Sequence, residues 1–169
     1  MENPLAIANY FVQKSIDTGQ ELTPLKLVKL VYISHGWYLA FTGVPLISEA
    51  VQAWKYGPVV QSVYTAFSKY GKDQISQPYN AFGLNKEPIT VKDPDLFRFL
   101  DKIWEVYKNH NGLQLSTLTH QPGTPWDIAW NKLNGKNRAS AEISNELIKD
   151  HYKQKIDANR EAAAKNGSV

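Results

Sequence analysis

The sequence predicts a mostly α-helical protein, a single compact helical domain with a small β element of two or three strands. At four places a polar residue that favours helix N-caps stands directly before a proline, and apolar residues follow at helical spacing. Residues near 50–55 instead alternate loosely between apolar and polar and lead into a glycine–proline turn. The 169 residues are 43% hydrophobic, which is enough for one buried core. The four helix starts are Asn3-Pro4, Thr23-Pro24, Asp93-Pro94 and Thr124-Pro125.

The second helix, which runs from Pro24 to Gly43, is expected at the centre of the domain because it is apolar on most sides. Gly36 lies inside it at a cost of about 1 kcal/mol relative to alanine. That glycine indicates either a close approach by another element or a chance occurrence. The expected solvent-facing side is narrow and consists of Lys26, Lys29 and Ser34.

The middle of the chain is less regular. A strand is expected around residues 50–55, followed by the turn Tyr56-Gly57-Pro58. Pro58 is predicted to open a third helix over residues 59–70. Residues 89–91 are the candidate partner strand, and such a two-stranded ribbon needs a helix to pack on.

The C-terminal half of the chain is again predicted to be helical. Leu113 to His120 is a candidate short helix, and the helix after Thr124 carries Trp126 and Trp130 on one face. Ser140 is predicted to cap the last helix, in which apolar spacing continues up to Asp157. We therefore expect one domain over residues 1–157 and a frayed, exposed tail over residues 158–169.

Composition excludes several kinds of chemistry. The chain has no cysteine, and no two of its four histidines lie within eight residues of each other, so we expect neither a metal site nor a cofactor. No apolar run reaches about 18 residues without a charge, and no signal-peptide pattern is present at the N-terminus. A protein with no membrane segment, located in the cytoplasm, is expected.

An enzyme is not expected either. The sequence contains no nucleophile elbow, Walker A loop or dinucleotide-binding glycine motif. Asp93 and Asp95 form a close carboxylate pair, but they flank a proline at a helix start, where acidic residues stabilise the helix. His35 is interpreted as a partly buried structural histidine with one hydrogen bond.

Nucleic-acid binding is the alternative function. The first two helices are joined by a short polar turn, as in a helix-turn-helix. However, the second helix is predicted to be buried, and Lys26 and Lys29 are too few to dominate phosphate binding. The net charge of +3 and a loop cluster of Lys132, Lys136 and Arg138 do not amount to an electrostatic footprint, so nucleic-acid binding is not favoured.

The most unusual local string is Trp54-Lys55-Tyr56-Gly57-Pro58. Aromatic residues beside such a turn either fill a core or form a protein-binding surface, where Trp and Tyr are enriched among hot spots. The same alternatives apply to Trp126 and Trp130. His120 is the best candidate for a polar anchor that links two helices.

The sequence resembles the Panacea domain, also called the SocA-like or GepA-like (phage-associated) domain. The resemblance is carried by the Lys-Leu-x-Lys-Leu-x-Tyr string of residues 26–32, the Trp-Lys-Tyr-Gly-Pro-Val string of residues 54–59 and the LSTLTH string of residues 115–120. It extends over roughly residues 4–153. One departure is Val28, where relatives often have glutamine.

The resemblance implies an antitoxin that neutralises a cognate protein toxin by direct binding. Toxins of such systems include small-alarmone-synthetase-like enzymes that modify tRNA, and one relative acts as an adaptor that delivers its toxin to a protease. A phage-encoded protein that acts on host defence is a related interpretation. No catalytic residue is implied. The residues expected to contact the partner, or to shape that contact, are Lys26, Lys29, Trp54, Lys55, Tyr56 and His120.

Overall fold

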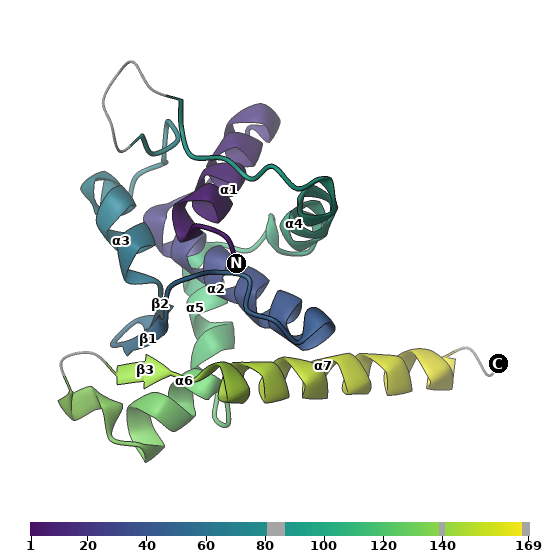
Figure 1. Ribbon diagram of the computed structural model, residues 1–169. Coiled ribbons are helices and arrows are strands. Elements are labelled where there is room, and N and C mark those ends of the chain that lie inside the picture. The colour runs from purple at the N-terminus through teal and green to yellow at the C-terminus, as the bar shows by residue number, and fades with distance from the viewer. Residues whose placement is uncertain (81–86, 139–140, 167–169) are drawn as a thin grey trace.

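The computed structural model describes residues 1–80, 87–138 and 141–166, and its organising element is helix α2 (Figure 1). Helix α2 spans Pro24–Thr42 and packs against β2 and all the longer helices of the described chain. Its neighbours are the helices α1 (Pro4–Thr18), α3 (Gln61–Phe67), α4 (Pro94–Tyr107), α5 (Gly112–His120) and α7 (Asn145–Asn166). The predicted helical fold with a central second helix is confirmed.

All four predicted N-caps are present. The Asn3 and Asp93 side chains accept the amides of the residues two positions ahead, at 2.9 and 2.8 Å. Thr23 and Thr124 accept the amides three positions ahead, at 3.4 and 3.3 Å. Each such cap stabilises its helix by about 1 kcal/mol. The carboxylate pair at the start of α4 is therefore a capping arrangement, as predicted.

Gly36 marks the closest approach between α2 and α7. A Cβ atom built on Gly36 would lie 2.1 Å from Cε2 of Tyr152, a distance at which atoms cannot coexist. The Tyr152 ring thus packs directly on the α2 backbone, and of the two interpretations of this glycine, the close approach is correct. On the same pair of helices, His35 is 1% exposed and its Nε2 lies 2.9 Å from Asn145 Oδ1.

The β element is a three-stranded antiparallel sheet with the order β2-β1-β3. Strand β1 (Val51–Trp54) confirms the strand expected near residues 50–55, and it pairs with β2 (Gly57–Val59) on one side and β3 (Ala141–Ile143) on the other. The predicted pairing with residues 89–91 is wrong, since these residues belong to no strand. The hairpin partner, β2, is closer to β1 in sequence than residues 89–91 are, whereas the third strand, β3, is much more distant.

Two predicted helix starts are therefore corrected. Pro58 lies in β2, and the third helix begins at Gln61 and continues into a 3₁₀ turn, η1 (Ser68–Tyr70). The last helix begins at Asn145, after a strand in which Ala141 and Ile143 are buried and Glu142 is exposed. Ser140, the predicted cap, lies outside the described residues. Ile143 fits the helical spacing of α7 by sequence, but pairing with β1 places it in the sheet.

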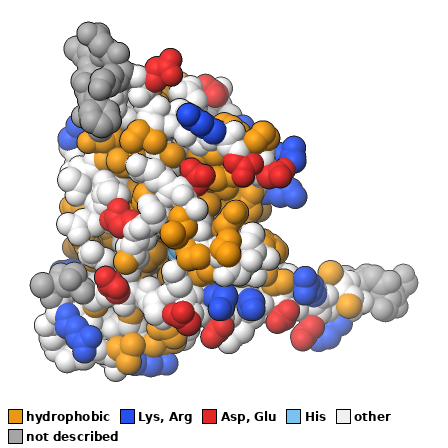
Figure 2. Space-filling model, viewed as in Figure 1, with side chains coloured by type: hydrophobic (Ala, Val, Ile, Leu, Met, Phe, Trp, Pro, Cys, Tyr) orange, Lys and Arg blue, Asp and Glu red, His pale blue; other side chains and the backbone are white. Residues whose placement is uncertain are grey.

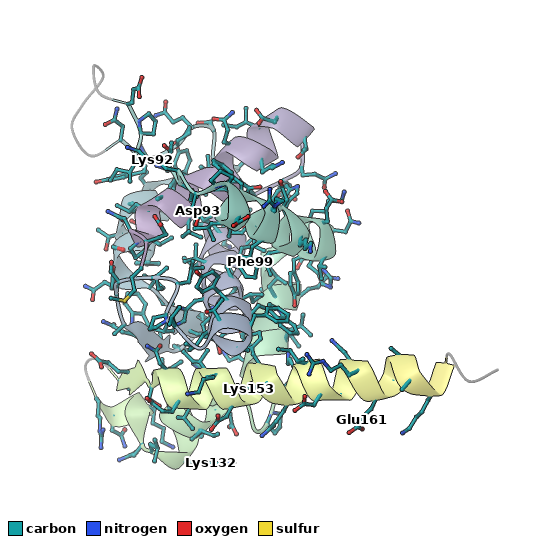
Figure 3. All side chains as sticks on the ribbon, turned by 45° about the vertical axis from the view of Figure 1, so that its right-hand side comes forward. Lys92, Asp93, Phe99, Lys132, Lys153 and Glu161 are labelled. Carbon is teal, nitrogen blue, oxygen red and sulfur yellow. The ribbon has the colours of Figure 1, made fainter. Side chains whose placement is uncertain are left out.

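The region before β3 is a sequence of short turns. Helix α6 (Pro125–Asp127) continues into a π-helical turn, η2 (Ile128–Lys132), and a 3₁₀ turn, η3 (Gly135–Asn137), follows. Figure 3 shows Lys132 of η2 on the opposite side of α7 from Phe99 of α4. These turns pack on β1 and β3 and connect the sheet to α5.

Helix α7 extends away from the rest of the protein (Figure 1). It continues to Asn166, and every side chain from residue 157 to residue 165 is exposed. Figure 2 shows basic and acidic side chains interspersed along this extension. The side chains of residues 158–165 are exposed and the backbone is helical up to Asn166, whereas the rest of the expected tail lies outside the described residues. The domain boundary at residue 157 stays a prediction.

Within the described part of the chain, every helix is either too short or too polar to cross a bilayer.

Candidate protein-binding site

The candidate site is the turn between β1 and β2, formed by Lys55 and Tyr56, which we call the Tyr56 turn. The register of the hairpin pairs Trp54 with Gly57, so the two intervening residues form the tip. Tyr56 is 68% exposed, one of the most exposed large apolar side chains of the described residues. The Lys55 ammonium lies 5.5 Å from the centre of the Tyr56 ring, a cation–π distance.

Side chains from other elements donate hydrogen bonds to backbone carbonyls of this turn and of the strand residue before it. The Trp126 indole of α6 donates to the Trp54 carbonyl at 2.8 Å. The Ser116 hydroxyl of α5 donates to the Tyr56 carbonyl at 3.2 Å. Because the donors come from helices that are themselves packed in the core, the turn has little freedom to move.

His120 contributes from the C-terminal end of α5. Its Nδ1 lies 2.6 Å from the Ser116 carbonyl oxygen, which is a hydrogen-bond distance. Its Nε2 lies 3.4 Å from the Lys55 carbonyl, and its ring packs on Trp126 with 4.0 Å between ring centres. His120 therefore links α5 to the Tyr56 turn through its polar contact, and its ring also packs on helix α6.

Lys29 lies beneath the same turn. Its ammonium donates to the Pro58 carbonyl at 3.0 Å, and the side chain is 0% exposed. Burial in a low-dielectric environment lowers the pKa of Lys29 to about 7. The prediction that Lys29 faces solvent is wrong, because α2 is buried on all sides at this point. Any part that Lys29 plays in partner binding must be through the shape of the turn.

Lys26 is also buried, and its predicted solvent position is wrong too. It is 4% exposed, and its ammonium donates to the carbonyls of Glu21 at 3.0 Å and Lys108 at 2.5 Å. The ammonium also lies 5.6 Å from the Trp104 ring. Burial lowers the pKa of Lys26, and the nearby Glu21 carboxylate opposes this effect. Lys26 ties α2 to the end of α4, and its contact with a partner stays a prediction.

The aromatic residues near the turn divide between core and surface. Trp126 is 7% exposed and stacks on Trp130 with 5.8 Å between ring centres. Trp54 is half-buried and packs edge-on against Tyr64, at 4.9 Å between ring centres. Tyr56 and Tyr64 lie at the surface, where they are 68% and 45% exposed. The string at residues 54–58 thus contributes to both core and surface.

The turn adjoins a shallow hollow of about 420 Å³ on α5, which includes Ser116 and His120. Leu113, on the same helix, is 72% exposed. Sequence reasoning missed Ser116, which binds the turn, and the exposed Leu113 on the same helix. The spacing of four residues between Ser116 and His120 in LSTLTH was the available signal, because it places both on one helix face.

The arrangement is suited to protein binding. No group of three or more His, Asp or Glu side chains positioned to hold a metal ion occurs in residues 1–80, 87–138 and 141–166. The helix that a helix-turn-helix would use for base readout is α2, which is buried. Lys132, Lys136 and Arg138 are exposed, and the Lys132 ammonium lies 4.0 Å from an Asp127 carboxylate oxygen.

Comparison with known proteins identifies the family. The family model for "Antitoxin SocA-like, Panacea domain" matches residues 27–127, more than half of the 169 residues, and the chain belongs to this family. A curated relative, the Antitoxin SocA of Caulobacter vibrioides (strain NA1000 / CB15N), is 29% identical over 156 residues. The match covers 89% of this chain and 83% of the relative. No solved structure matches the chain.

The family confirms the resemblance that the sequence carries, and it supports an antitoxin role of a regulatory rather than catalytic kind. The matched range includes Lys29, the Tyr56 turn and His120. An antitoxin family also implies a cognate toxin as partner. Whether the Tyr56 turn contacts that partner stays a prediction.

Proposed function

We propose that this protein is an antitoxin that neutralises a protein toxin by binding it directly, with the Tyr56 turn as a main contact. The observation that carries the proposal is an exposed tyrosine on a hairpin turn. Side chains from three helices bind the carbonyls of that tyrosine and of the adjoining strand residues Trp54 and Pro58. The family supports the antitoxin role, and the geometry supports a binding surface at this position.

The physical argument concerns preorganisation. Association loses side-chain and loop freedom, at about 0.5–1.5 kcal/mol for each side chain that becomes ordered. A turn fixed before the partner arrives avoids most of this cost for its backbone. Tyrosine is among the residues enriched in interface hot spots, because it offers a large apolar ring and a polar hydroxyl. The shallow hollow on α5 lies next to this turn, because Ser116 both lines the hollow and binds the Tyr56 carbonyl.

The kind of toxin that this protein binds is inferred only from its family. A small-alarmone-synthetase-like enzyme that modifies tRNA is the toxin class that we propose first. Neutralisation by blocking the toxin and neutralisation by delivery to a protease both require the same complex, so one experiment tests their shared step.

The experiment is co-expression with the protein encoded by the adjacent gene. We expect growth rescue and co-purification at a defined ratio with the wild-type antitoxin. Tyr56→Ala should weaken the complex by about 2 kcal/mol, roughly thirtyfold in affinity, if Tyr56 is a hot spot. Isothermal titration calorimetry measures the change.

Phe41→Ala is the matched control, because Phe41 is 61% exposed and lies at the far end of α2, stacked on Trp37. It should leave the affinity unchanged. Equal losses in both variants, or no loss in Tyr56→Ala, would remove the Tyr56 turn from the interface. A toxic neighbour that the wild-type protein does not rescue would count against the antitoxin proposal itself.

A further inference from the structure

We propose that Lys29 is a positioning residue that holds the Tyr56 turn in its partner-binding conformation from inside the protein. That this conformation binds a partner rests on the function proposed above, whereas the effect of Lys29 on the turn is a property of the free protein. Lys29 cannot touch a partner, because it is fully buried. Its effect passes through the backbone of Pro58 and Gly57.

The burial of Lys29 is costly for stability. Among the described residues no carboxylate forms an ion pair with it, and its ammonium makes one hydrogen bond, to the Pro58 carbonyl. A buried amine with so little compensation is less favourable than an apolar side chain of similar length. The hydrogen bond of the amine to Pro58 gives a reason for a lysine at this position, because it fixes β2, the strand that follows the Tyr56 turn.

Gly57 shows how closely the turn rests on this amine. A Cβ atom at this position would lie 2.5 Å from the Lys29 ammonium and 2.8 Å from Cε1 of His120. The φ angle of Gly57 is 106°, a conformation that residues with a side chain rarely adopt. Lys29 and His120 thus fill the space directly under the backbone, and loss of the amine opens that space.

Lys26 provides a natural comparison. It lies on the same helix, is also buried and also binds backbone carbonyls, but these belong to Glu21 and Lys108, away from the turn. The two lysines share their chemistry and differ in the backbone that they hold. A general effect of removing a buried lysine would appear at both positions, and a positioning effect would appear only at Lys29.

The first test compares Lys29→Met with Lys26→Met. Amide hydrogen exchange of residues 55–57 is measured by NMR in the free protein, and affinity is measured for the protein encoded by the adjacent gene. In Lys29→Met we expect exchange at the turn to rise roughly fivefold to tenfold, and affinity to fall by a similar factor, as for one lost hydrogen bond. Lys26→Met should leave both quantities at the turn unchanged.

The second test restores the amine chemically. The chain has no cysteine, so Lys29→Cys provides a unique thiol that can be alkylated in denaturant before refolding. Alkylation with 2-bromoethylamine gives a side chain of lysine's length with a terminal amine, and alkylation with 1-bromopropane gives the same length with a methyl group. The amine form should recover wild-type exchange at residues 55–57, and the propyl form should not.

The outcomes separate the two proposals. Equal exchange in the amine and propyl forms, or equal effects of Lys29→Met and Lys26→Met at the turn, would overturn the positioning role. If the wild-type protein does not bind the neighbouring gene product, the proposed partner fails, while the exchange comparison still decides whether Lys29 positions the turn.

Discussion

At the scale of single residues, buried lysines are the main feature of this protein. Lys26 and Lys29 both lie on the central helix, and both are buried. Each ammonium is directed at backbone carbonyls of another segment, so each works as a long hydrogen-bond donor that reaches out of the helix. When a helix has few polar residues, its lysines are expected to mark the side that faces solvent. In this protein that expectation is wrong for both lysines.

The depressed pKa of Lys29 predicts a pH dependence of stability. The folded pKa is about 7 and the ordinary value is 10.5, so between these values the unfolded chain binds more protons than the folded one. The free energy of unfolding therefore gains a contribution that rises with pH from 7 upward, by at most about 1.4 kcal/mol per pH unit. The cost of burying the charge is fully present below pH 7.

Lys29→Met should lack this contribution. Urea unfolding of both proteins at pH 7, 8 and 9, below the ordinary titration range of tyrosine near 10, measures the difference in slope. Parallel pH profiles for the two proteins would show that the Lys29 amine is not titrating in this range.

At the scale of elements, the contact between α2 and α7 depends on the missing side chain of Gly36. The Tyr152 ring occupies the place where a Cβ atom would be, and the same ring contacts Trp37 and Tyr32 with 5.1 and 6.2 Å between ring centres. The long C-terminal helix is thereby fixed to the centre of the core. The sheet is fixed to the helices in a different way, through side-chain donors to backbone carbonyls.

Gly36→Ala should destabilise the protein. Alanine gains about 1 kcal/mol of helix propensity, but the overlap with Tyr152 forces the helices apart, at about 1–3 kcal/mol or more. We expect a net loss of about 1–2 kcal/mol in the free energy of unfolding, measured by urea denaturation. In a double-mutant cycle, Gly36→Ala should cost much less in a Tyr152→Leu background. Additive losses would show that Tyr152 is not the source of the strain.

At the scale of the whole molecule, one packed domain carries an extended helical end. The described core involves α1 to α7, whereas the side chains of residues 157–165 are exposed. Alternating charges along this extension, such as the pair of Asp157 and Arg160 at 3.9 Å, stabilise an exposed helix only weakly. The extension therefore contributes little to the stability of the domain.

A chain that ends after Asp157 should fold normally. Its free energy of unfolding should lie within about 0.5 kcal/mol of the full-length value, because the side chains of residues 158–165, which are lost, are exposed. A chain that ends after Leu147 should not fold, since it lacks the buried Ile148 and Tyr152. Circular dichroism and urea unfolding measure both. A large loss in the first truncation would place the domain boundary beyond residue 157.

The sequence by itself determined the helices that begin at a capping residue followed by proline. Local signals sufficed for the four capped starts and for the buried character of α2, because caps and apolar periodicity act within a few residues. The family strings likewise directed attention to residues 54–58 and to His120. Exposure of Tyr56 and the anchoring role of His120 are consistent with that emphasis.

Only the tertiary structure decided the sheet and the site. Ala141 to Ile143 fit a helix start by spacing, and their pairing with β1, about 90 residues earlier in the chain, makes them a strand. Lys29 is polar by type and was expected in solvent, but α5 and the hairpin close over it. Long-range contacts of this kind leave no local pattern, because each depends on which distant segment covers the residue.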